Sequence, residues 1–284
     1  MISEATSCLL TFGPMKTPEF VQEEMITIES KLLERKVPID LYFNKGLLES
    51  NEGTSVLLVN DGQDLKSMDF ATVFDEGLRN HHWPANLLII GIHAGPLRKM
   101  EYGMSASTDY LGRGAKASIY TRFILEELLA IVVSQSRVKS VKDISIAGFS
   151  LGGLSALDIS WNNPSVFSKV GVFSGALWWR SIDQDHPDYS DAKHRLMHNQ
   201  VAASKKREGM KFFFECGTLD EKNDRNKNGI IDSIDDTLDL IKELKLLGYQ
   251  ESTELHYEEI AGGKHDIATW KKAWPAFIKW AYNS

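Results

Sequence analysis

The sequence has little cysteine, little proline and no long uncharged apolar run, and each of these absences excludes a class of protein. Its 284 residues include 2 Cys and 8 Pro, too few for a disulfide framework or a proline-rich disordered chain. Cys8 and Cys216 favour a reducing compartment, so we expect a cytoplasmic protein. A membrane-spanning helix needs ~18 uncharged apolar residues. The best candidate, residues 123–133, is interrupted by Glu126 and Glu127.

Positive charge is also scarce. The 32 Lys and Arg residues are outnumbered by 39 Asp and Glu, which gives a net charge of -7. This balance provides no electrostatic footprint for nucleic acid or an anionic membrane, and we predict neither as a partner. Residues 1–14 contain no Lys or Arg and no apolar stretch of signal-peptide length, which predicts that the chain is not exported. The sequence leaves the oligomeric state open.

Length and hydrophobic content predict one domain over residues 1–284. The chain is 43% hydrophobic, and at this length one core can bury about 75% of the surface that the unfolded chain exposes. No internal repeat or Pro/Gly/Ser-rich linker divides the sequence. Residues 179–209 are rich in charge and His, and we interpret them as a cap-type insertion over a site.

Eight short apolar or alternating runs predict strands. They cover residues 25–35, 37–43, 55–60, 87–93, 143–148, 169–173, 210–216 and 254–260. The first two are joined too closely for a crossover helix, so we expect an antiparallel pair. Later runs alternate with helical patterns at 119–134, 233–247 and 269–282. This alternation predicts an α/β fold, with a mostly parallel eight-stranded sheet and helices on both faces.

Residues 148–152 read Gly-Phe-Ser-Leu-Gly, the G-x-S-x-G pattern of a nucleophile elbow. The pattern is weak alone, but here it follows a predicted strand and precedes a helical segment, which is the context that the elbow requires. Ser150 is therefore the predicted nucleophile. Its position before a helix also predicts that the Leu151 N–H stabilises a developing oxyanion.

In α/β-hydrolases the catalytic residues follow the chain order Ser, then Asp or Glu, then His. This sequence contains an acid and a histidine after Ser150 in the same order. His265 directly follows the last predicted strand and is the predicted general base. Asp220, in the loop after residues 210–216, is the predicted acid. Glu221 and Asp224 are rival acids, and all three carboxylates could instead be solvated loop charges.

Other candidates follow neighbouring strands. The second oxyanion donor is predicted at the backbone N–H of Gln63 or Asp64, although an Asp-Gly β-turn alone explains that loop. Four further side chains are predicted to bind substrate: Trp178, Trp179, Arg98 and His93. Either tryptophan could instead pack under the insertion, and Arg98 could instead pin the long loop that precedes residue 119.

Several segments of the sequence together resemble a known family. The antiparallel start, residues 57–63, Arg98, residues 148–153, 174–179, 216–220 and 262–265 resemble the esterase D-like "putative esterase" family of the α/β-hydrolase superfamily. This group includes enterochelin esterases, feruloyl esterases and mycolyltransferases. The resemblance covers the chain from about residue 25 onward. It implies an α/β-hydrolase fold and a Ser-His-Asp esterase that acts on acyl esters of sugars, phenolic acids or siderophores and needs no catalytic cofactor.

A second motif lies in the predicted acid loop and follows the spacing of a calcium loop. Its candidate ligands are Asp224, Asn226, Asn228, Ile230 through its carbonyl, Asp232 and Asp235. The motif predicts a structural Ca²⁺, with Arg225 pointing outwards. The segment departs from the usual calcium loop in two ways. Its last position holds the shorter Asp235 in place of Glu, and no helix is predicted before it. The alternative is a turn in which Asp232 or Ser233 caps the next helix, with Ser233 and Asp236 as a capping box.

These observations predict a serine carboxylesterase for small-molecule esters. An acyltransferase would use the same catalytic residues with a different acceptor. A non-catalytic protein that binds carbohydrate or a partner would keep the fold without the reaction.

Overall fold

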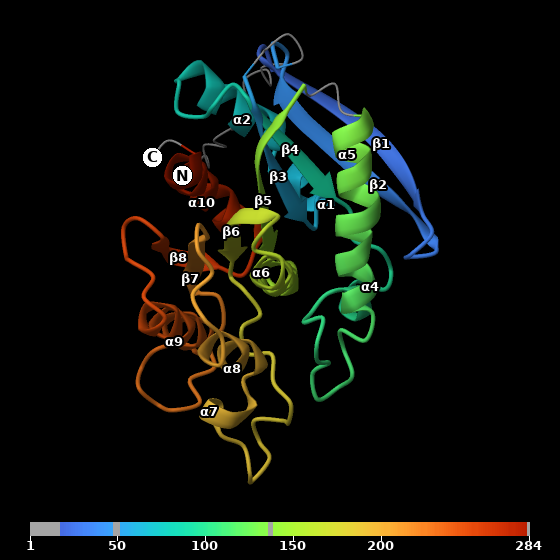
Figure 1. Ribbon diagram of the computed structural model, residues 1–284. Helices are drawn as coiled ribbons and strands as arrows, with labels where there is room; N and C mark the ends of the chain where they lie inside the picture. The colour runs from blue at the N-terminus through green and yellow to red at the C-terminus, as the bar shows by residue number, and fades with distance from the viewer. Residues whose placement is uncertain (1–17, 48–51, 136–138, 283–284) are drawn as a thin grey trace, which may run out of the picture.

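Eight strands form one sheet in the computed structural model, which describes residues 18–47, 52–135 and 139–282 (Figure 1). Cys8 and residues 1–14, from which we predict that the chain is not exported, lie outside these residues. The spatial order is β1-β2-β4-β3-β5-β6-β7-β8. The strands are β1 (Val21–Ser30), β2 (Arg35–Asn44), β3 (Thr54–Asn60), β4 (Leu87–Ile92), β5 (Val141–Phe149), β6 (Phe167–Phe173), β7 (Lys211–Leu219) and β8 (Leu255–Lys264). Neighbouring strands from β4 to β8 pair in parallel, which confirms the predicted fold class.

The first two strands form the predicted antiparallel pair, and β2 also runs antiparallel to β4. The predicted first strand, residues 25–35, was wrong at its end, because residues 31–34 form a turn. Glu34 has a positive φ of 53° there. The Glu127 carboxylate accepts hydrogen bonds from the backbone N–H groups of Lys31 and Leu32 at 3.0 and 3.2 Å. These bonds join the turn to a helix far away in the sequence.

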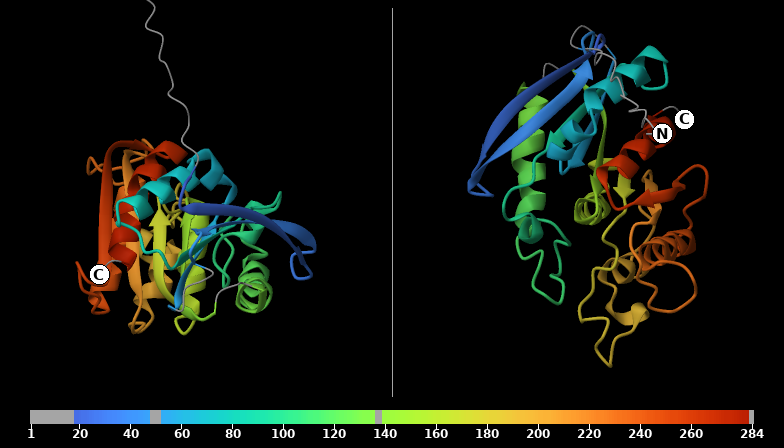
Figure 2. Two further views of the ribbon diagram at one scale, coloured as in Figure 1. Left: turned by 90° about the horizontal axis from the view of Figure 1, so that it is seen from above. Right: turned by 180° about the vertical axis from the view of Figure 1, so that it is seen from behind.

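Helices cover both faces of the sheet, and each face has its own hydrophobic cluster (Figures 1 and 2). One face carries α1 (Gln63–Ser67), α2 (Phe70–Arg79) and α10 (Ile267–Tyr282). The other carries α4 (Ala117–Arg122), a π-helical turn (Phe123–Leu128), α5 (Leu129–Gln135), α6 (Leu151–Asn162), α8 (Leu196–Ala202) and α9 (Asp232–Leu246). The short helices α3 (Arg98–Glu101) and α7 (Asp191–His194) complete the set. The three predicted helices are present, with bounds shifted by one or two residues.

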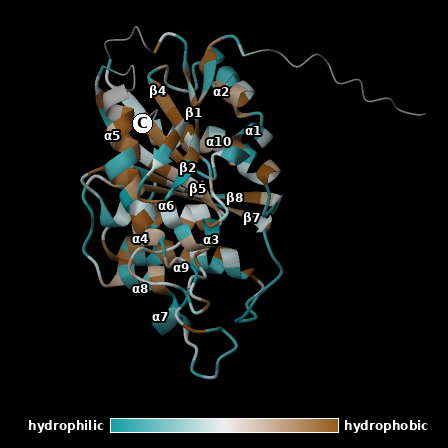
Figure 3. Ribbon diagram, turned by 90° about the vertical axis from the view of Figure 1, so that its right-hand side faces the viewer, coloured by the Kyte–Doolittle hydropathy of each residue, from teal (hydrophilic) through white to brown (hydrophobic). Residues whose placement is uncertain are grey.

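The central strands are apolar throughout, because both of their faces are covered. Every residue of β3 and β4 is buried, as expected for strands of a parallel sheet between two helical layers. Figure 3 shows this contrast, with β4 in hydrophobic brown and the peripheral α7 in teal. Among the described helices, none is both long and apolar enough to cross a membrane.

The sheet topology brings the predicted catalytic residues to one edge. Ser150, Asp220 and His265 directly follow β5, β7 and β8. Because these strands are parallel, their carboxyl ends lie along the same side of the sheet. This is the edge at which open α/β sheets bind their ligands.

Candidate active site

Ser150 occupies a strained turn between β5 and α6. Its φ and ψ are 53° and −120°, which a residue with a side chain rarely adopts. The turn is held by two bonds to β6 and its loop: Ser150 N–H donates to the Phe173 carbonyl at 2.8 Å, and Ala176 N–H donates to the Ser150 carbonyl at 3.0 Å. The strain and its fixation match the predicted elbow geometry.

The two glycines of the motif are required by close backbone approach. A Cβ on Gly148 would lie 2.3 Å from the Gly152 carbonyl oxygen. A Cβ on Gly152 would lie 2.6 Å from Oδ2 of Asp61, at the end of β3. Both positions must therefore lack a side chain for β5, α6 and β3 to meet at Ser150.

His265 and Asp220 face each other across the ends of β7 and β8. His265 Nδ1 lies 4.0 Å from Asp220 Oδ2, which is close enough for an ion pair but too long for a hydrogen bond. The Asp220 side chain is 1% exposed and that of His265 is 40% exposed. Gly217 permits this approach, because a Cβ there would lie 2.5 Å from the Gly263 backbone and 2.7 Å from Asp220 Oδ1.

Burial is the main influence on the protonation of this pair. It lowers the pKa of His265, an effect that the negative charge of Asp220 opposes and the positive charge of Arg98 reinforces. The imidazole is therefore neutral near pH 7 and able to accept a proton. Burial raises the pKa of Asp220, and the Ser174 hydroxyl and the charge of His265 oppose this rise.

The rival acids are placed differently. Asp224 is committed to its own turn, because its two carboxylate oxygens accept hydrogen bonds from the backbone N–H groups of Asn228 and Gly229 at 3.1 and 2.9 Å. Glu221 lines the same pocket as Asp220, and burial followed by the charge of Asp232 raises its pKa. Of the three carboxylates, Asp220 is the one that forms an ion pair with His265.

Trp270 on α10 packs against His265 and against the residue before Ser150, although the sequence indicated only a core residue. Its ring stacks on Phe149, directly before Ser150, with centroids 5.0 Å apart. It meets the His265 ring edge to face at 5.3 Å. Its Nε1 donates to Ser174 Oγ at 2.9 Å. Ser174 has a positive φ of 44° and directly follows β6 at the same edge.

The two candidates for the second oxyanion donor differ in availability. The Asp64 backbone N–H already donates to the Asp61 carbonyl at 2.9 Å. Gln63 begins α1, and its side-chain oxygen accepts from the Ala94 N–H at 3.0 Å. This contact involves the side chain of Gln63 and not its backbone N–H. The Gln63 N–H is therefore the better candidate for the second oxyanion donor. Leu151 is the first residue of α6, where backbone N–H groups have no partner within the helix.

A pocket of about 200 Å³ lies beside the acid and the histidine. It is lined by Ser174, Gly175, Trp178, Asp220, Glu221, Ser233 and His265. Trp178 forms an aromatic wall, and the guanidinium groups of Arg113 and Arg180 lie 4.7 and 5.9 Å from its ring centre. This arrangement can hold a flat ring against Trp178.

The structure corrects the prediction for Trp179. This side chain is fully buried, and its Nε1 donates to the Ser107 carbonyl at 3.2 Å. Its ring fills the space beside Gly103 and Gly114, where an added Cβ would lie 2.7 and 2.9 Å from it. Trp179 therefore packs under the loop before α4, and it cannot contact a substrate.

Arg98 and His93 both have acidic partners. Arg98 makes two hydrogen bonds of 2.6 Å to the buried Asp61 carboxylate, and its side chain remains 31% exposed. His93 Nε2 lies 2.6 Å from Oδ2 of Asp40, a buried residue of β2. Neither lines the pocket at Trp178. The bond to Asp40 makes His93 a link between β2 and β4.

The predicted calcium loop brings three of its side chains together. The amide nitrogens of Asn226 and Asn228 donate to the same oxygen of Asp235 at 2.8 and 2.9 Å. Asp232 instead accepts from the Arg225 backbone N–H at 2.8 Å. In the part of the chain that the structure describes, no three Asp, Glu, His or Cys side chains are grouped as a metal site. Amide and carbonyl oxygens would have to complete any Ca²⁺ shell here.

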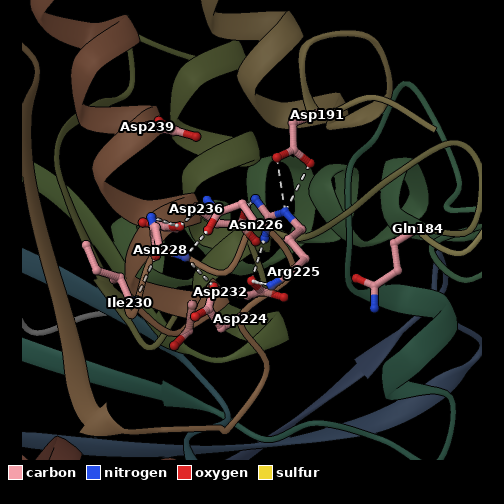
Figure 4. A network of polar contacts seen from close by, with 12 residues as sticks. Gln184, Asp191, Asp224, Arg225, Asn226, Asn228, Ile230, Asp232, Asp236 and Asp239 are labelled. Atoms are coloured by element: carbon pink, nitrogen blue, oxygen red, sulfur yellow. Dashed lines mark hydrogen bonds and ion pairs between the residues drawn. The ribbon is translucent and has the colours of Figure 1, made fainter.

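Two expectations for this loop were wrong. Arg225 points inwards, with its side chain 13% exposed, and pairs with Asp191 of α7 and Asp236 of α9 (Figure 4). The next helix is capped at Ile231 with no side-chain hydrogen bond, so Ser233 and Asp236 form no capping box. The Asp236 carboxylate instead accepts hydrogen bonds from the guanidinium groups of Arg195 and Arg225.

A comparison with family models identifies the chain. Residues 30–280 match the family described as "Putative esterase". The chain belongs to this esterase family. It is therefore a carboxylic ester hydrolase, as the resemblance implied. A search of the curated proteins gave no match.

Solved structures show the same fold as this esterase at low identity. A ferulic acid esterase has a TM-score of 0.67 at 17% identity, covering 93% of this chain and 99% of the other. The enterobactin esterase of Shigella flexneri has a TM-score of 0.70 at 17% identity, covering 93% of this chain and 59% of its own. An IroE-like serine hydrolase of Shewanella oneidensis has a TM-score of 0.68 at 19% identity, covering 92% and 80%.

Proposed function

We propose that this esterase is a serine carboxylesterase in which Ser150, His265 and Asp220 act as nucleophile, general base and orienting acid. The observation that carries the proposal is the strained Ser150 at the sheet edge that also holds the His265 and Asp220 pair. In the resting structure this pair is 4.0 Å apart, and such contacts often shorten when substrate binds.

The reaction follows from these roles. Ser150 Oγ attacks the ester carbonyl while His265 Nε2 takes its proton, and the carbonyl oxygen becomes an oxyanion. The N–H groups of Leu151 and Gln63 stabilise that charge. The tetrahedral intermediate then releases the alcohol, which receives the proton from His265, and Ser150 is left acylated. Water, deprotonated by His265, attacks the acyl group, and the acid leaves as Ser150 regains a proton.

The substrate class proposed is an ester of a sugar, phenolic acid or siderophore. Structural neighbours include proteins described as a ferulic acid esterase, an enterobactin esterase and a siderophore hydrolase. The flat wall at Trp178 and the pocket of about 200 Å³ suit an acyl group of one ring. Residues 179–209 contain α7 and α8 and are proposed as the cap beside the pocket.

We also propose that Asp224, Asn226, Asn228, Ile230, Asp232 and Asp235 bind a structural Ca²⁺. The calcium-loop spacing and the placement of Asn226 and Asn228 beside Asp235 support this site, although both amides, which now donate to Asp235 through nitrogen, would have to turn their oxygens to the ion. The Asp232 carboxylate now accepts a hydrogen bond from the Arg225 backbone N–H, and it would have to give up that bond to ligate the ion. Bound Ca²⁺ would fix the loop that carries Asp220 and would take no part in the reaction.

A panel of chromogenic acyl esters, from acetyl to feruloyl, tests the proposal. We expect wild type to hydrolyse esters with short or single-ring acyl groups. Ser150→Ala should lose at least about 1,000-fold in kcat, because the nucleophile is removed. Matching activity in wild type and Ser150→Ala would contradict the proposed mechanism. Transfer of the acyl group to an added sugar alcohol in preference to water would instead identify an acyltransferase.

A further inference from the structure

Glu215 is a fully buried carboxylic acid on β7, five residues before Asp220, and its charge has no evident structural use. Its exposed fraction is 0%. Among the described residues, neither side-chain oxygen of Glu215 nor of Asp220 has a hydrogen-bond partner of good geometry. Burying an ionised carboxylate without donors costs a large amount of free energy. The two acids therefore cannot both be charged without another group that compensates.

Among the described residues, the charged groups that act most strongly on Glu215 are acids rather than cations. Its titratable neighbours are Asp220 from the following loop, Glu258 from the paired position on β8, the Cys216 thiol and the Tyr257 hydroxyl. Ser174, which directly follows β6, and Trp270 of α10, which contacts Ser174, do not titrate. Ser174 N–H donates to the Glu215 backbone carbonyl at 2.8 Å. Trp270 Nε1 donates to Ser174 Oγ, which leaves the Ser174 hydroxyl hydrogen for one of the two carboxyls.

The electrostatics of the site agree with a protonated Glu215. Burial, followed by the charge of Asp220, raises the pKa of Glu215 to about 8, and contacts with Ser174 oppose the rise. The Ser174 hydroxyl also lowers the pKa of Asp220. At neutral pH Glu215 thus carries a proton that it can donate, while Asp220 lies next to the cation that forms on His265 during the reaction.

We propose that Glu215 is a positioning residue, whose protonated carboxyl and the neighbouring Ser174 hydroxyl are the donors that hold the Asp220 carboxylate toward His265. This inference rests on the proposed triad. The proton stays on Glu215 throughout the reaction. When it is lost at high pH, two buried carboxylates repel each other, Asp220 turns from His265, and kcat falls.

The test is the pH profile of kcat and KM from about pH 5 to about pH 10. Wild type should lose kcat on the alkaline side with a midpoint near pH 8. Glu215→Gln keeps a donor that cannot ionise, so kcat at pH 7 should stay within about threefold of wild type and the alkaline loss should disappear. Glu215→Ala removes the donor, and kcat should fall about tenfold or more at pH 7 with KM little changed. Glu258→Gln on the adjacent strand should keep kcat at pH 7 and keep the alkaline loss, with a slightly lower midpoint because the charge of Glu258 no longer raises the pKa of Glu215.

An alkaline loss that is unchanged in Glu215→Gln overturns the inference. Infrared difference spectra of wild type minus Glu215→Gln at pH 7 give a second measurement that needs no activity and is independent of the stability of Glu215→Ala. A protonated carboxyl band present in wild type supports the inference, and its absence overturns it. The proposed triad fails separately, if ester hydrolysis survives in Ser150→Ala.

Discussion

At the scale of single residues, the candidate active site depends on close approaches that only glycine allows. Gly217 separates the acid loop from the histidine loop, and a Cβ there would meet both Gly263 and Asp220. Gly217→Ala should therefore move Asp220 relative to His265. We expect kcat to fall by about 100-fold, since displacements of about 1 Å have effects of this size. Stability should fall by about 1–3 kcal/mol because the site is overpacked.

Steady-state kinetics and thermal melting measure these two effects. Gly46→Ala is the matched control, because among the described residues a Cβ there meets only Asn44 Oδ1, at an ordinary contact distance of 3.5 Å. The control should keep kcat and the melting temperature. Wild-type kcat in Gly217→Ala would contradict the role assigned to the contact between the two loops.

At the scale of elements, the loop from β7 to α9 carries both Asp220 and the proposed calcium ligands. Arg225 within it joins α7 to α9 through Asp191 and Asp236 (Figure 4). We expect Ca²⁺ at about 100 times its Kd to stabilise the fold by about 2.7 kcal/mol, which raises the melting temperature by about 5 °C or more. EDTA should remove this gain.

Asn228→Ala should abolish the calcium-dependent shift, because its amide is one of the two that meet Asp235. Lys222→Ala, an exposed change in the same loop outside the motif, should keep the shift. Melting curves of wild type and of both variants, each in EDTA and in excess Ca²⁺, measure this shift. Identical curves for wild type under both conditions would show that the loop holds itself by its own hydrogen bonds.

At the scale of the whole molecule, the sheet was predictable because buried parallel strands are almost purely apolar. Runs such as residues 55–60 and 87–93 carry this signal in themselves, and turns separate them clearly. Strand ends were less predictable. β8 extends to Lys264 because it pairs with Leu219 of β7, and such pairing depends on a partner distant in sequence.

The candidate site was predictable where one local motif fixes the geometry, as at Ser150. The positions of site residues were less predictable where contacts with segments distant in sequence determine them. Trp178 and Trp179 are adjacent, yet one lines the pocket and the other is buried by a loop some 70 residues earlier. Arg225 turns inwards because Asp191 and Asp236 lie there. Glu215 did leave a signal, an acid inside the apolar run Phe-Phe-Phe-Glu-Cys, whose significance depends on its burial.

The most direct test of the central claim is covalent labelling with a fluorophosphonate, followed by peptide mass spectrometry. We expect one adduct on Ser150 in wild type, a much slower adduct in His265→Ala and none in Ser150→Ala. Melting temperatures of the three proteins show that each is folded. An adduct on another residue, or an unlabelled wild type that still hydrolyses esters, would contradict the claim that Ser150 is the nucleophile.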